Sequence, residues 1–117
     1  MKLTNRVIFT SVESLNKLNN LELPVKVAYA VKKNIDALNV QIKFIGERRN
    51  ELIEKHGKDR KIDIADKESV LAFNKDFNDV LEIEEEVEVK AISIDELGDA
   101  KLSSADLDAL SFMLTFE

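Results

Sequence analysis

The chain has 117 residues, the length of one domain, and 44% of them are hydrophobic while 34% are charged. This composition excludes a disordered chain, and the absence of cysteine excludes disulfide bonds, thiolate nucleophiles and thiolate metal sites. The net charge of −6 is uneven, because residues 1–80 contain 15 Lys/Arg and 12 Asp/Glu whereas residues 81–117 contain 2 and 11. Only three glycines and one proline are present, which favours long helices over a many-stranded fold.

The sequence also predicts where the protein works. Residues 1–6 lack the apolar core of an export signal, and no apolar run approaches the ~20 residues of a membrane span. A chain without cysteine suits a reducing compartment. We therefore expect an intracellular protein with no membrane segment.

The first predicted helix starts at Thr4 or Asn5, because either side chain can cap it. It should end near the pair Asn19-Asn20, since adjacent asparagines favour turns. Its apolar face comprises Ile8, Val12 and Leu15, with Val7 and Leu18 beside them.

The strongest periodic signal predicts one long helix over residues 24–56. Pro24 is well placed in the first turn, where its missing N–H had no partner, and Gly57 is the natural stop. Apolar residues recur there every three or four positions for more than three heptads, with Arg49 in the one interrupted slot. They are Ala28, Val31, Ile35, Leu38, Ile42, Ile45 and Leu52.

Residues 57–65 form a charged connection in which Ile62 and Ile64 alternate and suggest a short extended piece. Asp66 then caps a third helix. A short connection between two helices predicts that they pack antiparallel, as a hairpin. The apolar stripe of the third helix is Val70, Phe73, Phe77 and Val80, flanked by Leu71 and Leu81.

The period changes to two after Leu81, which predicts a half-buried strand near residues 82–94. Ile83, Val87, Val89 and Ala91 share the inner face, and the outer face carries Glu82, Glu84, Glu86, Glu88 and Lys90. The phase reverses at Ala91 before Ile92 and Ile94, as a bulge or bend would produce. The strand's partner is either the Ile62–Ile64 piece or the same strand of a second chain, because one strand cannot satisfy its own backbone.

A turn over residues 95–99 precedes a last helix, which Ser103 and Asp106 cap together. Its stripe is Leu107, Leu110 and Leu114, and Phe112, Met113 and Phe116 add apolar bulk. The sequence therefore predicts a single domain, residues 1–117, of mainly α class with a minor β element (α+β). Its centre is a long helix in an antiparallel hairpin, with a short helix at each end of the chain.

Helix lengths then suggest contact surfaces. The third helix is less than half as long as the second and reaches only about Ile42 to Leu52. The seam made by Ala28, Val31, Ile35 and Leu38 needs other cover, either from the first and last helices or from a second copy. We expect a homo-oligomer, with this seam as a candidate contact surface.

Catalytic chemistry has little support in the sequence. His56 is the only histidine and is best interpreted as a helix-end residue that suits the helix dipole. Glu84, Glu86 and Glu88 project in parallel rather than converging on a cation, so a solvated strand face is favoured over a metal site. Glycine loops that cradle phosphate are absent, and acidic residues neutralise the basic ones along residues 32–61. We expect no enzyme, catalytic residue, metal or cofactor, and we do not favour nucleic-acid binding.

Several segments carry a resemblance to a known group. In order they are Leu23–Lys26, Ala28–Ala30, Glu47–Gly57, Phe73–Asn78, Val87–Val89, Asp95–Leu97 and Leu102–Leu107. Together they resemble a family of small, mostly uncharacterised proteins of tailed bacteriophages and prophages. The resemblance covers most of the chain but contains no catalytic motif. It implies a viral origin and a role in the infected cell or in particle assembly, hence in the host cytoplasm or the virion.

Two functional hypotheses follow. The first is a non-enzymatic phage assembly protein that binds itself and a phage or host protein through the long helix and the acidic strand. The second is an inhibitor of a host defence or replication protein, in which Glu84, Glu86 and Glu88 mimic nucleic-acid phosphate.

Overall fold

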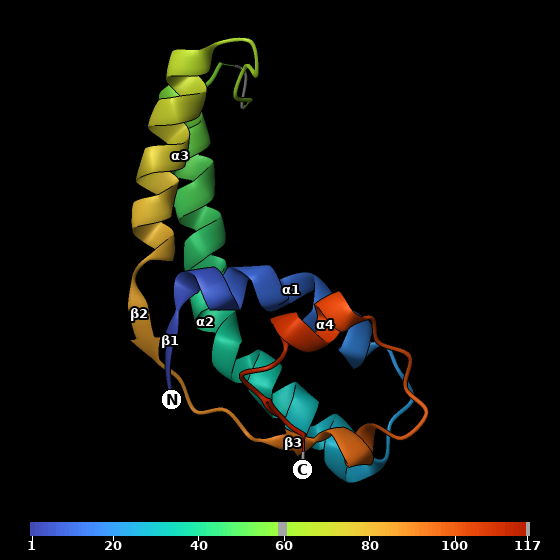
Figure 1. The fold of residues 1–117 in the computed structure, drawn as a ribbon. Helices are drawn as coiled ribbons and strands as arrows, with labels where there is room; N and C mark the ends of the chain where they lie inside the picture. Colours follow the sequence, from blue (N-terminus) through green and yellow to red (C-terminus); the bar gives the residue numbers. More distant parts are fainter. Residues whose placement is uncertain (59–60, 117) are drawn as a thin grey trace.

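The computed structural model describes residues 1–58 and 61–116 and confirms a mainly helical fold with two small sheets (Figure 1). None of the helices in these residues is both long enough and apolar enough to cross a membrane. In chain order the elements are β1 (Lys2–Thr4), α1 (Asn5–Asn19), α2 (Val25–His56), α3 (Lys67–Leu81), β2 (Glu84–Glu86), β3 (Ile92–Ser93), the 3₁₀ helix η1 (Ile94–Leu97), α4 (Ser104–Ala109) and β4 (Leu114–Thr115).

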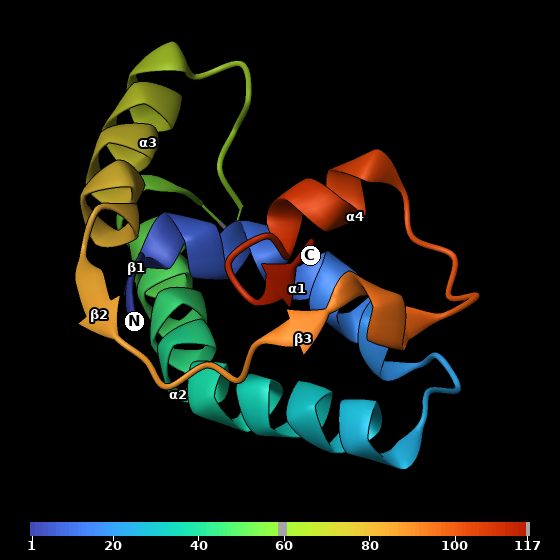
Figure 2. The same ribbon diagram turned by 60° about the horizontal axis from the view of Figure 1, so that its bottom comes forward.

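The α2–α3 hairpin projects away from the other elements, as Figure 1 shows, and the molecule measures 47 × 27 × 21 Å. Within it α2 and α3 run antiparallel side by side, as predicted. Helix α1 crosses α2 at the base of the hairpin. Figure 2 shows that α1, α4 and β3 lie on the same side of the first half of α2. The molecule therefore consists of a packed body and a two-helix arm.

The helix boundaries follow local capping signals. The Thr4 hydroxyl accepts a hydrogen bond from the Val7 amide, and the Asp66 carboxylate accepts one from the Ser69 amide. Pro24 precedes α2, and Gly57 ends it with a backbone hydrogen bond to the Ile53 carbonyl. A Cβ at Gly57 would collide with the backbone carbonyl of Lys61, so only glycine fits this close approach.

The body covers the inner face of α2 within one chain. Val31 and Leu38 are 1% and 0% exposed and pack in the core with Ile8 of α1 and Met113 near the C-terminus. The expected gap over this part of the seam is therefore absent, and self-association is not needed to bury it. Four residues of the predicted seam, Val31, Leu38, Ile45 and Leu52, are buried as expected, whereas Val27 and Asn34 are buried in place of Ala28 and Ile35.

The strand predicted near residues 82–94 is instead two short strands. Each pairs with a strand of the same chain, and neither pairs with the Ile62–Ile64 piece. β2 pairs antiparallel with β1, with Leu3 opposite Glu85. β3 pairs parallel with β4, with Ile92 opposite Leu114. The phase reversal at residue 91 is confirmed, because Val87 and Ile92 are both buried.

Asn34 of α2 binds the backbone of the segment that connects β2 to β3. This side chain is fully buried, its Nδ2 donates to the Lys90 carbonyl at 3.0 Å, and its Oδ1 accepts from the Lys90 amide at 2.7 Å. The amide side chain thus takes the place of a neighbouring strand for one residue. The Lys90 amide and carbonyl therefore have hydrogen-bond partners at the point where the backbone has left β2 and crosses α2.

Two further expectations need correction. The last helix ends at Ala109, because Leu114 and Thr115 pair with β3 instead of continuing the helix. The segment 62–65 forms no strand, and Ile64 is 89% exposed; positions 59–60 of the same connection lie outside the described residues.

Replacing Asn34 with alanine tests the strand break. The variant loses two buried hydrogen bonds and leaves the Lys90 amide and carbonyl without partners, so we expect it to destabilise the protein by about 2–4 kcal/mol. Urea unfolding followed by circular dichroism measures this. Asn39→Ala, at an exposed position of the same helix, should cost under about 0.5 kcal/mol. Equal losses in the two variants would contradict the role of Asn34.

Asp106 should make the docking of α4 on α1 dependent on pH. A hydrogen bond from Lys17 at 2.7 Å, one from the Ser103 amide at 3.0 Å and one from Ser14 at 2.8 Å hold the pKa of this carboxyl far below its usual range. The folded state prefers the ionised form, so the stabilisation is complete above the unfolded pKa of about 3.9 and falls as the pH drops below it.

We therefore expect the difference in urea midpoint between the wild type and Asp106→Asn to be constant at neutral pH and to shrink below about pH 4. Asp108→Asn, at an exposed position of the same helix, serves as the matched control. A difference that stays constant down to pH 2.5, about one and a half units below the unfolded value, would contradict this assignment.

Candidate interaction surface

The predicted contact seam on α2 is mostly inside the protein. Val31 and Leu38 lie in the core, Ile35 is half-buried, and Ala28 alone of the four is exposed. In this fold a partner can reach Ala28 but not the two buried residues. The other candidate, the acidic strand, does lie at the surface, with Glu84, Glu86 and Glu88 all exposed.

The acidic strand is partly neutralised by the chain's own N-terminal strand. The α-amino group of Met1 donates to Glu86 Oε1 at 2.8 Å, and Lys2 lies 3.9 Å from Glu84. The amino group, by its hydrogen bond and its charge, holds the pKa of Glu86 below its usual range. These glutamates therefore help to attach β1 to β2, and of the three only Glu88 has no ion pair with a described residue.

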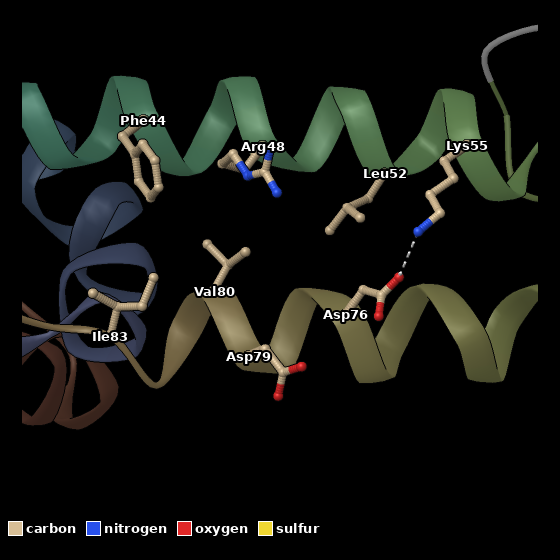
Figure 3. Close-up of a pocket in the computed structure, with 8 residues that line it drawn as sticks. All are labelled: Phe44, Arg48, Leu52, Lys55, Asp76, Asp79, Val80 and Ile83. Atoms are coloured by element: carbon tan, nitrogen blue, oxygen red, sulfur yellow. Dashed lines mark ion pairs between the residues drawn. The ribbon is translucent and has the colours of Figure 1, made fainter.

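A hollow lies on one face of the hairpin, between α2 and α3 (Figure 3). We call it the hairpin groove. Its floor is apolar: Leu52 and Val80 are 6% and 7% exposed, and Phe44 and Ile83 at one end are each 39% exposed. The residues that line it are Phe44, Arg48, Leu52, Lys55, Asp76, Asp79, Val80 and Ile83.

The charged side chains of the groove form two rows of opposite sign. Arg48 and Lys55 project from α2, and Asp76 and Asp79 come from α3 (Figure 3). Lys55 Nζ lies 3.7 Å from Asp76 Oδ2. Within the described part of the chain, Asp79 makes no ion pair.

His56 is coupled to this groove through Asp76. Its Nε2 lies 2.7 Å from Asp76 Oδ2, and this hydrogen bond is the main reason that the pKa of Asp76 is below its usual range. The pair links the last turn of α2 to the middle of α3. This imidazole and this carboxylate provide a polar contact that holds the two helices of the hairpin together.

The groove continues onto the outer side of α2. A smaller hollow next to it is lined by Val40, Gln41, Phe44 and Glu85, so Phe44 belongs to both. Val40 is 70% exposed although it lies in the middle of the long helix. Exposed apolar side chains that adjoin one another on one face are typical of protein contact sites.

Sequence reasoning missed this surface. Val40 and Phe44 lie outside the predicted seam, and Ile83 was assigned to the buried face of a strand. The available signal was the four-residue spacing of Val40 and Phe44, which puts a second apolar pair on the helix face opposite the core. Only the packing of α3 shows that this pair adjoins Ile83.

No group of three or more His, Cys, Asp or Glu side chains that could hold a metal ion occurs in residues 1–58 and 61–116. Comparison of the chain with models of protein families, with curated proteins and with solved structures gives no match. The geometry of the chain's own surface is therefore the basis for the functional argument.

Reversing Glu86 tests the link between the acidic strand and β1. Glu86→Lys places an ammonium group beside the α-amino group of Met1, so we expect β1 to open more often and its amides to exchange with deuterium about threefold faster. Glu88→Lys makes the same charge change nearby and should leave the exchange of residues 2–4 unchanged. If both variants behave alike, the ion pair does not hold the strand.

Proposed function

We propose that this chain is a phage-encoded, non-enzymatic protein that acts through protein–protein contacts in assembly, and that the hairpin groove is its contact surface. The observation that carries the proposal is the exposure of Phe44, Ile83 and Val40 on one face of a projecting arm. These three side chains adjoin one another at the surface, whereas Val31 and Leu38 of the same helix are almost completely buried, and adjoining exposed apolar side chains are typical of protein contact sites. The phage origin rests on the sequence resemblance.

The form of the groove favours a protein partner over a small molecule or a nucleic acid. The groove runs lengthwise between two helices, its floor is apolar, and the charged side chains along it are of both signs. A nucleic-acid site would present one sign of charge with aromatic side chains for stacking. An apolar centre bordered by polar and charged side chains is the common pattern of a protein interface.

Nucleic-acid mimicry by the acidic strand is the weaker alternative. Two of its three glutamates, Glu84 and Glu86, already face cationic groups of the N-terminal strand. A phosphate mimic needs carboxylates that are free to face a basic groove. Of the three, only Glu88 makes no ion pair with a described residue, and this favours the assembly hypothesis.

The proposed partners are a second copy of the chain and a phage or host protein, in the host cytoplasm or the virion. No cofactor or metal takes part in this proposal. Binding through α2 and α3 needs no catalytic group, because affinity comes from burying apolar side chains and aligning charges at the rim.

Site-specific photocrosslinking in the natural host cells tests the proposal. A photoreactive phenylalanine analogue at position 44 should form a covalent adduct with a protein, because the Phe44 side chain is 39% exposed and lies at the end of the groove, where a bound partner would touch it. The same analogue at position 25, where Val25 is 85% exposed at the start of α2, is the matched control. Adduct masses from electrophoresis and mass spectrometry show whether the partner is the chain itself or another protein.

An adduct at position 44 but not at position 25 supports a protein contact at the groove. If position 44 gives no protein adduct in cells with normal levels of the folded protein, the proposal fails.

A further inference from the structure

We propose that a second copy of this chain binds the hairpin groove about a twofold axis that runs along the groove, parallel to α2 and α3. This inference rests on the proposed function and names its partner. In the resulting dimer the two hairpins form a four-helix bundle. Each α2 lies against the α3 of the other copy, and Arg48 of each copy faces Asp79 of the other.

The two charged rows carry the argument. A twofold interface places the same surface of both copies face to face, so the surface must be complementary to itself. In the groove the row from α2 is basic and the row from α3 is acidic (Figure 3). Rotation about an axis along the groove exchanges the two sides and brings each basic row over an acidic one.

The alternative axis is excluded by the same charges. A twofold axis across the groove would place α2 over α2, so the basic row would face the basic row, and the acidic row the acidic row. Like charges that meet in an interface are costly. Arg48 lies across the groove from Asp79 and Val80 at nearly the same level, as Figure 3 shows. The axis along the groove therefore brings Arg48 of one copy over Asp79 of the other without a shift along the helices.

The apolar floor and the helix directions agree with this arrangement. Phe44, Leu52, Val80 and Ile83 lie near the axis, so two copies would bury them together. Each helix would have antiparallel neighbours on both sides, as in four-helix bundles of up-and-down type. The exposed parts of the Phe44 and Ile83 side chains would then lie in the centre of the bundle.

The body of the molecule leaves this face accessible. Helix α1 meets α3 through Phe9 and Phe77, whose rings lie 5.5 Å apart in an edge-to-face arrangement, and neither residue lines the groove. Arg48 contacts Glu51 in its own helix, an exposed pair that is easily exchanged for an intermolecular one. Asp79 is exposed and makes no ion pair with any residue that the structure describes.

Charge exchange at positions 48 and 79 tests the geometry. Arg48→Asp and Asp79→Arg each create two like-charged pairs in the dimer, so each should weaken self-association by about tenfold in sedimentation equilibrium at low salt. The double variant R48D/D79R restores both pairs and should recover most of the affinity. A mixture of the two single variants should form heterodimers in preference to either homodimer, which native mass spectrometry detects.

Two controls keep the result specific. Lys26→Asp and Glu13→Lys make the same changes of net charge at exposed positions of α2 and α1 outside the groove, and their mixture should show no preference for heterodimers. Thermal unfolding by circular dichroism checks that all the variants fold, as expected for exposed side chains.

Two outcomes would overturn the inference. If the wild type stays monomeric up to about 1 mM, the groove does not bind a second copy. If it dimerises but the charge variants behave like the controls, the dimer uses another surface or axis. An adduct between position 44 and a different protein, together with a monomeric wild type, would refute this inference and leave the proposed function standing.

Discussion

The inner face of α2 must be covered along its whole length, and the rest of the structure follows from this requirement. The helix has 32 residues, whereas its hairpin mate α3 has 15. One mate therefore cannot bury a stripe that runs from Val27 to Leu52. The chain places α1 over the first half of α2, with α4 packed on α1, and α3 covers the second half. Burial of that stripe, together with the side chains that pack on it, contributes to the hydrophobic driving force for the fold.

Because the two halves of α2 are covered by different parts of the chain, a segment must connect these parts, and residues near both termini form the strands that pair with it. The segment from β2 to β3 must cross from the hairpin to the body along α2, and its backbone needs partners on the way. The N-terminal strand provides them for residues 84–86, Asn34 provides them at Lys90, and β4 provides them for Ile92–Ser93. The arm, in contrast, has no third layer on the groove side. An apolar floor with Phe44 and Ile83 at its end is therefore left at the surface.

Local signals in the sequence were sufficient for the helices. Capping residues Thr4, Asp66 and Ser103 begin three of them as predicted, and Gly57 ends the longest. These signals depend on hydrogen bonds within four residues, so neighbouring elements hardly alter them. The reversal at residue 91 was also readable, because Val87 and Ile92 are both buried. The alternation itself was only partly right, since Ile83 and Ala91, which were expected inside, are exposed.

The sequence by itself thus determined the helices, the antiparallel hairpin and the exposure of Glu84, Glu86 and Glu88. Only the tertiary structure decided which residues complete the buried face of α2, which strands pair, and where the hairpin groove lies. Val31, Leu38, Ile45 and Leu52 were predicted correctly, but Val27 and Asn34 are buried where Ala28 and Ile35 were expected, and both choices fit a helical period equally well. The neighbours that select between them come from distant parts of the chain. The physical reason is that capping and periodicity are local, whereas burial depends on every element that packs nearby.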